Sequence, residues 1–288
     1  MNFGQILTAM ITPFDEKGGI DFEQTSILID YLLENGTDGL VIAGTTGESP
    51  TLTEDEKISL YQHVVKHVNK RVPVIAGTGS NNTAASISLT KEAEACGVDA
   101  VMLVAPYYNK PSQQGMYEHF AAIAKETSLP VMLYNIPGRS VVKMTAETII
   151  NLSSIDNIVS VKEASGDLDQ IADIIENTSA EFSVYSGDDG LTLPMLAIGA
   201  EGVVSVASHI IGNEMKEMMD DFQQGNIRDA ASKHRKLLPI MNGLFTAPNP
   251  SPVKAALQIK GIESGGVRLP LISLTEEETD QLKILLQQ

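Results

Sequence analysis

The chain has 288 residues, 43% hydrophobic and 20% charged, which is ordinary for a soluble globular protein. Its net charge of −17 comes without a cluster of Lys and Arg, which argues against binding to nucleic acid or an anionic membrane. No apolar run approaches the length that spans a bilayer, and we expect no signal peptide. Cys96 is the only cysteine, so an intrachain disulfide is excluded and we expect a cytoplasmic protein.

Short apolar runs recur about every 25 to 30 residues, with amphipathic helical patterns between them. The runs predict strands near residues 5–13, 39–44, 73–78, 100–107, 130–135, 158–163, 182–187 and 202–206. The patterns between them predict helices near 22–35, 54–69, 82–96, 112–127, 145–153, 167–177, 190–199 and 213–224. Eight evenly spaced βα units predict a TIM (β/α)8 barrel, with a doubly wound open sheet as the structural alternative.

The strand pattern stops after about residue 225. The remaining sequence predicts helices near residues 227–244, 251–260 and 275–287, separated by several prolines. We therefore expect a barrel catalytic domain over residues 1–225 and a C-terminal helical extension over residues 226–288.

Lys162 ends a β-branched run that predicts a buried strand. Alternation places Val159 and Val161 on one face of this strand, with Ser160 and Lys162 on the other. Burial penalises an ammonium group, and a lysine pKa lowered to ~7–8 makes the neutral amine available near neutral pH. Such an amine can attack a carbonyl and form a Schiff base. A strand-end lysine that reaches out to water is the open alternative.

The other chemically useful residues also follow predicted strands. In a parallel barrel the C-terminal strand ends form one rim, where the chemistry takes place. The glycines of Gly44–Gly47 let backbone N–H groups approach a small anion, and the planar guanidinium of Arg139 suits a carboxylate. The other candidates on this rim are Thr45, Thr46, Tyr108, Tyr134, Gly187 and Val204. Taken singly, a tight turn or packing aromatics would also explain these motifs.

No metal site is expected. The five histidines are dispersed, and Asp188 and Asp189 are expected to order a turn. No Ser-His-Asp arrangement, P-loop or Gly-x-Gly-x-x-Gly fingerprint stands out.

Four motifs in order resemble the signatures of the 4-hydroxy-tetrahydrodipicolinate synthase family, also called the dihydrodipicolinate synthase family. They are Gly44-Thr45-Thr46-Gly47-Glu48, Pro106-Tyr107-Tyr108-Asn109, Tyr134-Asn135-Ile136-Pro137-Gly138-Arg139 and Val161-Lys162-Glu163-Ala164. The similarity runs from about Gly4 to the C-terminal helices and includes the run Pro248–Lys254. It implies a TIM barrel with a helical extension, no cofactor, and a homo-oligomer that is usually a tetramer of two tight dimers.

The resemblance also implies an activity. Members of the family condense pyruvate with L-aspartate-4-semialdehyde in the diaminopimelate route to lysine. Lys162 would form the Schiff base with pyruvate, and Tyr134 would donate and accept protons. Thr45 and Tyr108 would complete a proton relay, with Tyr108 reaching in from the neighbouring subunit.

Substrate contacts are implied in the same way. Thr46 and the backbone at Val204 would hold pyruvate, Gly187 is a further candidate contact, and Arg139 would bind the carboxylate of the semialdehyde. N-acetylneuraminate lyase and the 2-keto-3-deoxy sugar-acid and hydroxy-oxoglutarate aldolases are rivals, although Arg139 favours the synthase. A catalytically inactive barrel that binds a small molecule is a second alternative.

Family members that are inhibited by L-lysine bind it at the dimer interface. Ser49, Asn81 and Tyr107 match that pattern, whereas Pro50, Glu54, Lys57 and Ala85 depart from it. The missing carboxylate and the additional positive charge of Lys57 imply weak or absent feedback inhibition.

Overall fold

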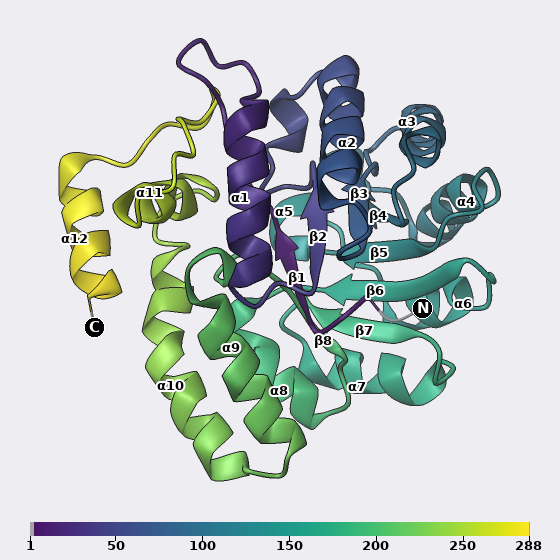
Figure 1. Ribbon diagram of the computed structural model, residues 1–288. Helices are drawn as coiled ribbons and strands as arrows, with labels where there is room; N and C mark the ends of the chain where they lie inside the picture. Colours follow the sequence, from purple (N-terminus) through teal and green to yellow (C-terminus); the bar gives the residue numbers. More distant parts are fainter. Residues whose placement is uncertain (1–2, 288) are drawn as a thin grey trace.

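The computed structural model describes residues 3–287, and eight parallel strands form a closed barrel at its centre (Figure 1). The strands pair in chain order, and β1 closes the barrel by pairing with β8. The predicted TIM barrel is therefore confirmed, and the open-sheet alternative is wrong. The strands are β1 (Ile6–Ala9), β2 (Gly39–Ile42), β3 (Val74–Gly77), β4 (Ala100–Val104), β5 (Val131–Asn135), β6 (Ile158–Glu163), β7 (Ser183–Ser186) and β8 (Gly202–Ser205).

Helices surround the barrel and connect its strands (Figure 1). They are α1 (Phe22–Glu34), α2 (Glu54–Val68), α3 (Thr83–Cys96), α4 (Gln113–Ala124), α5 (Pro137–Ser140), α6 (Ala146–Leu152), α7 (Leu168–Asn177), α8 (Thr192–Ala197) and α9 (Ser208–Gln223), with short 3-10 helices η1 (Ser49–Thr51) and η2 (Asp189–Leu191). Capping residues close in the sequence explain where several of these helices begin or end. Thr53 and Glu56 form a capping box at the start of α2, and Gly97 ends α3 at φ 84°.

Two elements differ from the sequence prediction. The short helix α5 was not predicted, and α9 begins at Ser208 rather than near residue 213, with non-helical angles at Ile211. The N-cap residue of α9, Ala207, has no side chain that can cap the helix, and the only local help is Ser205 Oγ, which accepts from the backbone N–H of Ser208 at 2.8 Å in the described part of the chain. Instead, the carboxylate of Asp189 accepts hydrogen bonds from the backbone N–H groups of Val206 and Ala207, at 3.1 and 2.9 Å. These two hydrogen bonds come from a carboxylate 17 and 18 positions earlier, so no local pattern indicates them.

Apolar side chains pack in two layers, one inside the barrel and one between the strands and the helices. The inner layer includes Leu7, Val41, Ile75, Met102, Met132, Tyr134, Tyr185 and Val204. Side chains alternate across each strand, so neighbouring residues such as Val203 and Val204 enter different layers. This alternation turns Tyr134 into the barrel.

The prediction that Val159 and Val161 lie on the same face of β6 is wrong. The register against β5 shifts there, because Val131 pairs with Ile158 whereas Met132 pairs with Ser160. Val159 is thus an extra residue in β6, and it packs against the inner layer while Val161 packs in the outer one. Such a bulge interrupts the alternation that the prediction assumed.

Beyond the barrel, the chain continues as three helices: α10 (Ile227–Gly243), α11 (Ser251–Ile259) and α12 (Glu276–Leu286). Both α10 and α11 pack against α9, and α12 contacts α10 and α11. Figure 1 shows these helices, in green to yellow, gathered on the side of the barrel where α1 and α9 lie. The predicted extension is therefore helical, whereas a domain boundary at residue 225 stays a prediction.

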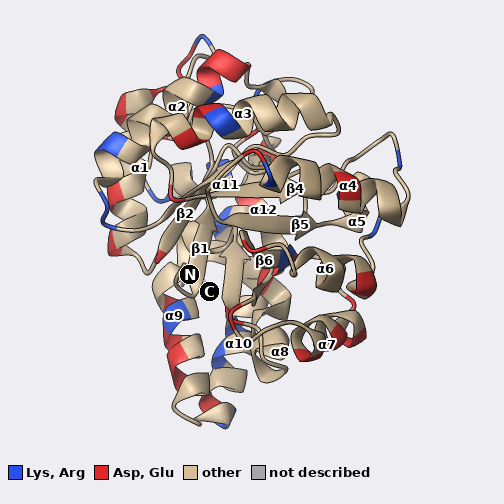
Figure 2. Cartoon of the chain, turned by 90° about the vertical axis from the view of Figure 1, so that its right-hand side faces the viewer, with Lys and Arg blue, Asp and Glu red and all other residues tan. Residues whose placement is uncertain are grey.

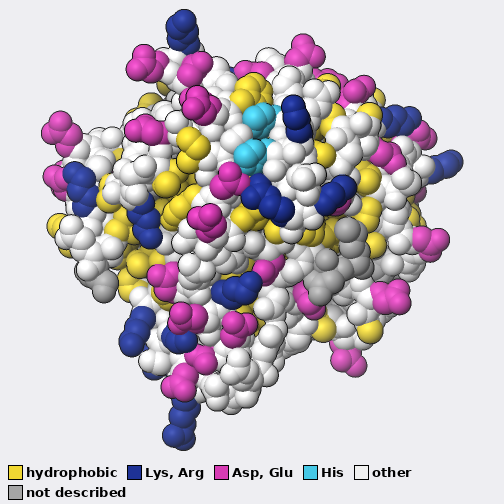
Figure 3. Space-filling view, viewed as in Figure 1, with side chains coloured by type: hydrophobic (Ala, Val, Ile, Leu, Met, Phe, Trp, Pro, Cys, Tyr) yellow, Lys and Arg dark blue, Asp and Glu magenta, His cyan; other side chains and the backbone are white. Residues whose placement is uncertain are grey.

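Charged residues lie mainly on the outer helices and loops, and the barrel strands are nearly free of them (Figure 2). On the face shown in Figure 3, Lys and Arg are scattered among Asp and Glu instead of forming a basic patch. Across residues 3–287, the helices include none that is long and apolar enough to cross a membrane.

Candidate active site

A cavity of about 250 Å³ lies where the chain leaves the C-terminal ends of β2 to β5. Residues that line it include Gly44, Thr45, Gly79, Tyr107, Tyr134 and Arg139. Three motifs that are far apart in the sequence therefore meet at one place. The closed barrel brings them together, because parallel strands deliver all their following loops to the same rim.

Lys162 and Tyr134 are neighbours inside the barrel. They are paired in the register of β6 with β5, and the Lys162 Nζ lies 4.1 Å from the centroid of the Tyr134 ring. Both side chains are buried, with only 6% and 4% of their surface exposed. Within residues 3–287, Lys162 forms no salt bridge, so no carboxylate ties up its amine. The next residue, Glu163, uses its carboxylate to accept hydrogen bonds from Asn135 and Ser165.

Gly187 follows β7 and packs directly against the Lys162 side chain. A Cβ atom at this position would lie 3.1 Å from Lys162 Cε and 2.6 Å from Ala164 Cβ. A side chain of any size would therefore push against Lys162 or against the side chain of Ala164. The absence of a side chain at residue 187 leaves Lys162 the space that it occupies.

The turn after β2 carries Thr45 and Thr46. Thr45 lines the cavity, and the buried Thr46 accepts a hydrogen bond from the amide of Asn249 over 2.9 Å. The carbonyl of Gly47 accepts a hydrogen bond from Thr12 Oγ1 at 2.8 Å. Glu48 then turns the chain with a left-handed φ of 57°. The turn is fixed at successive residues by contacts to distant parts of the chain.

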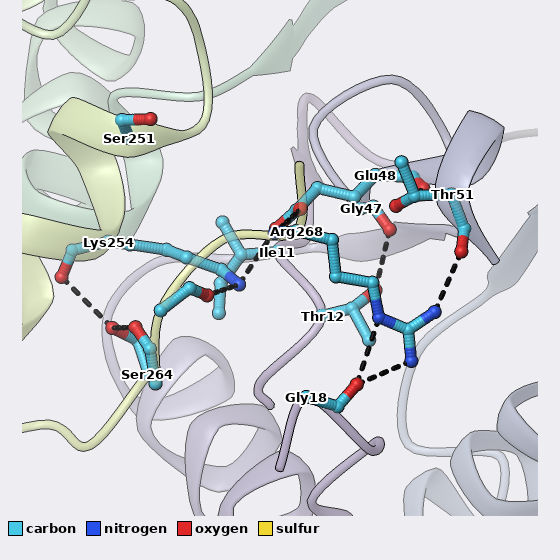
Figure 4. A network of polar contacts seen from close by, with 12 residues as sticks. Ile11, Thr12, Gly18, Gly47, Glu48, Thr51, Ser251, Lys254, Ser264 and Arg268 are labelled. Carbon is cyan, nitrogen blue, oxygen red and sulfur yellow. Dashed lines mark hydrogen bonds and ion pairs between the residues drawn. The ribbon is translucent and has the colours of Figure 1, made fainter. Parts of the chain in front are cut away.

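A second buried lysine anchors the end of this turn (Figure 4). The Lys254 Nζ, on α11, lies 2.8 Å from a Glu48 carboxylate oxygen and donates to the carbonyl of Gly266 at 2.6 Å. Burial lowers the pKa of Lys254 to about 8, although the charge of Glu48 acts in the opposite direction. The backbone N–H of Arg268 donates to the other oxygen of Glu48 at 2.9 Å. Lys254 is thus an ion-paired anchor, whereas Lys162 has no ion-pair partner among the described residues.

Tyr108 and Arg139 lie on the rim, whereas Val204 lies inside the barrel. Tyr108 has a left-handed φ of 73°, and 88% of its surface is exposed. Arg139 is exposed at the cavity edge, and its guanidinium has no salt bridge in the part of the chain that the structure describes. Val204 is buried in β8, paired with Leu7 of β1.

Sequence reasoning attached no role to Asn249 and Lys254. The run Pro248–Lys254 belonged to the family resemblance, which was the only signal available. Asn249 lies 203 positions after Thr46, and nothing local in the sequence connects the two residues. Their contact becomes visible only once the extension is packed against the barrel.

Metal-binding clusters of His, Cys, Asp and Glu do not occur among residues 3–287. Asp188 orders the turn after β7, as predicted for this acidic pair, because its Oδ1 accepts a hydrogen bond from the backbone N–H of Gly190 at 2.9 Å. Asp189 instead contacts the chain before α9, which was not predicted. Cys96 is half-buried, and burial raises the pKa of its thiol, which disfavours a reactive thiolate.

Comparisons with known proteins agree with the geometry. The model of the dihydrodipicolinate synthetase family matches residues 2–288. The chain is 65% identical to 4-hydroxy-tetrahydrodipicolinate synthase 2 of Halalkalibacterium halodurans, with 100% of this chain and 99% of that protein covered. It superposes on a dihydrodipicolinate synthase of Bacillus anthracis with a TM-score of 0.99 and 61% identity, covering 100% and 98% of the two chains. The lysine-bound enzyme of Cyanidioschyzon merolae matches with a TM-score of 0.97 and 46% identity, covering 99% and 97%.

Proposed function

The chain belongs to the dihydrodipicolinate synthetase family, and from this premise we propose that it condenses pyruvate with L-aspartate-4-semialdehyde. The product is 4-hydroxy-tetrahydrodipicolinate. The observation that carries the proposal is the unpaired amine of Lys162, buried beside the ring of Tyr134 at the end of β6. A buried amine without a counter-ion is suited to attack a carbonyl.

The reaction begins at Lys162. Its neutral amine attacks the keto carbon of pyruvate, and loss of water gives a protonated imine. Removal of a methyl proton sends the electrons of the C–H bond into the imine, which gives an enamine. The enamine carbon forms a bond to the aldehyde carbon of the second substrate. The amino group of that substrate then attacks the imine carbon, which closes the ring and releases Lys162.

Each of these steps moves a proton, and the phenol of Tyr134 exchanges one with the substrate bound to Lys162. The 4.1 Å distance between the Lys162 Nζ and the centroid of the Tyr134 ring supports this role. Thr45 lines the same cavity and continues the path for the proton. Tyr108 completes the relay from a neighbouring subunit, which accounts for an aromatic side chain with 88% of its surface exposed. We therefore propose a homo-oligomer, by family analogy a dimer of dimers.

Two positions bind the carboxylates of the substrates. Thr46 and the backbone at Val204 hold pyruvate, with Gly187 beside the nucleophile. Arg139 binds the carboxylate of the semialdehyde, and its free guanidinium at the cavity edge supports this role. The single half-buried cysteine fits a protein that works in the reducing cytoplasm.

Borohydride trapping tests the nucleophile. The protein is treated with pyruvate and borohydride together, and the modified peptide is mapped. We expect the adduct on Lys162 alone, and none when pyruvate or borohydride is omitted. Lys254, the other buried lysine, is an internal comparison, because its ion pair with Glu48 should protect it. An adduct on Lys254, or on any lysine other than Lys162, would contradict the mechanism.

A coupled assay with L-aspartate-4-semialdehyde then tests the reaction. We expect turnover with this aldehyde and none with N-acetylmannosamine or short sugar aldehydes. Trapping at Lys162 together with turnover of only a sugar aldehyde would identify one of the related aldolases. No trapping at all would indicate an inactive barrel. Sedimentation at the assay concentration tests the shared relay, since a fully active monomer is incompatible with a partner's Tyr108.

A further inference from the structure

The C-terminal extension contacts the proposed pyruvate-binding turn through one side-chain amide. Asn249, just before α11, directs its Nδ2 at Thr46 Oγ1 over 2.9 Å. Only 6% of Asn249 and 4% of Thr46 is exposed, so water does not replace this hydrogen bond. A threonine hydroxyl has one proton and two lone pairs. When the amide occupies a lone pair of Thr46, the hydroxyl proton remains free for another acceptor.

The segment that follows Asn249 is anchored at two points. Within the same segment, Ser251 Oγ donates to the carbonyl of Ile272 at 2.7 Å, and Lys254 is paired with Glu48 (Figure 4). Asn249 and Glu48 therefore connect the same two segments of the chain at points a few residues apart. Neither segment can shift along the other without breaking a buried hydrogen bond or ion pair.

We propose that Asn249 is a positioning residue of the reaction, acting through Thr46. By donating to Thr46 Oγ1, the amide directs the hydroxyl proton toward the carboxylate of pyruvate. This inference rests on the assignment of Thr46 to pyruvate binding in the proposed function. The other oxygen of pyruvate's carboxylate is then free for backbone donors of the same turn.

The direction of the hydrogen bond is what an experiment can read. In Asn249→Asp, an ionised carboxylate has no proton to donate, so it accepts the proton of Thr46 and turns the hydroxyl away from pyruvate. A protonated carboxyl group can donate again. Burial raises the pKa of such a carboxyl group above its ordinary value of about 3.9, which brings its titration toward the range in which the enzyme can be assayed.

The experiment measures KM for pyruvate and kcat for Asn249→Asp and the unaltered enzyme from about pH 5 to pH 8. We expect the KM of the variant to be raised about 10- to 100-fold at pH 8, because that is the effect of losing a hydrogen bond to a charged group. The KM should fall back toward the unaltered value as the pH decreases, while kcat at saturating pyruvate changes less. Recovery at low pH is a readout that a merely structural role would not produce.

Asn157→Asp is the matched control. Asn157 precedes β6, at the opposite end of the barrel, and its amide donates to the carbonyls of Ala124, Thr127 and Leu129 at 2.9, 3.1 and 3.2 Å. The same chemical change there should lower stability without altering the pH dependence of KM. A second comparison combines Asn249→Ala with Thr46→Val, and the double variant should bind pyruvate no worse than Thr46→Val alone.

Two results would overturn the inference. One is a KM for Asn249→Asp that follows the unaltered enzyme at every pH, and the other is full additivity of Asn249→Ala with Thr46→Val. Both are read in an enzyme that still traps pyruvate at Lys162. If the unaltered protein does not trap pyruvate, the proposed function fails instead, so the two failures are distinguishable.

Discussion

Glu48 and Lys254 form a buried ion pair, and removing either partner should lower the free energy of unfolding, by a larger amount for Lys254 than for Glu48. The side chains are 0% and 3% exposed, and the Lys254 Nζ also lies 4.2 Å from the centroid of the Phe14 ring. Lys254→Met leaves the Glu48 carboxylate buried, and within residues 3–287 the backbone N–H of Arg268 is then its one remaining donor. Removing one partner of a buried ion pair costs about 3–5 kcal/mol, so we expect a loss of that size in the free energy of unfolding.

Glu48→Gln should cost less, because the remaining lysine can lose its charge. The pKa of Lys254 is already lowered to about 8. Releasing a proton at pH 7 from a group with that pKa costs about 1.4 kcal/mol, and the lost hydrogen bond adds about 1 kcal/mol. The double variant Glu48→Gln with Lys254→Met leaves no buried charge. We therefore expect it to be at least about 2 kcal/mol more stable than the sum of the single losses predicts.

Urea unfolding of the four proteins at pH 7 measures this coupling. The protein concentration is kept the same in all experiments, because assembly makes the midpoint concentration-dependent. Additive losses would mean that the two charges do not depend on each other. A loss below about 1 kcal/mol for Lys254→Met would show that the carboxylate is well solvated without its partner, and either result refutes the reasoning.

Four further predictions follow from individual residues. Gly187→Ala should cost about 1–3 kcal/mol of stability and reduce borohydride trapping, because its Cβ would lie 3.1 Å from the nucleophile's Cε; unchanged trapping would contradict this. Arg139→Ala should leave trapping intact and lower kcat/KM for the semialdehyde about 30- to 1000-fold in the coupled assay, whereas equal losses for both substrates would indicate a structural role. Hydrogen bonding to Arg268 holds the pKa of Glu56 at about 2, below its ordinary 4.5. The stability that this ion pair adds is present above pH 4.5 and is lost as the pH falls toward 2. Allowing for solvent screening, the free energy of unfolding should fall by about 1–2 kcal/mol more on acidification in the unaltered protein than in Glu56→Gln. L-lysine should inhibit weakly or not at all, since Ala85 offers no carboxylate, and half-inhibition below about 1 mM with saturating pyruvate would contradict this.

The barrel could be predicted from the sequence because each strand carries its own signal. β6 was predicted at residues 158–163 and lies at Ile158–Glu163, since a β-branched run bounded by polar residues marks both of its ends. The capping box at Thr53 likewise marked the start of α2 within a few residues of sequence. Local chemistry was sufficient wherever the partners of an interaction are close in the chain.

The structural features that the sequence did not predict depend on partners far apart in the chain. The start of α9 is capped by Asp189, and the bulge at Val159 depends on how β6 pairs with β5. At the candidate site, the residues gathered by strand ends could be listed in advance, because the barrel rule states where those ends meet. The contact between Asn249 and Thr46 follows no such rule. It depends on the packing of the extension, which sequence periodicity does not describe.

The order of synthesis also determines when the turn after β2 can reach its final conformation. Arg268 donates through its guanidinium to Gly18 and Thr51, and through its backbone to Glu48, more than 200 positions earlier. A ribosome releases the nucleophile and the substrate turn long before it releases these anchors. During synthesis, all eight strands can therefore be present while the turn proposed to bind pyruvate is still unsupported. A chain that ends before Arg268 would therefore carry every side chain proposed for catalysis and still lack the contacts that fix this turn.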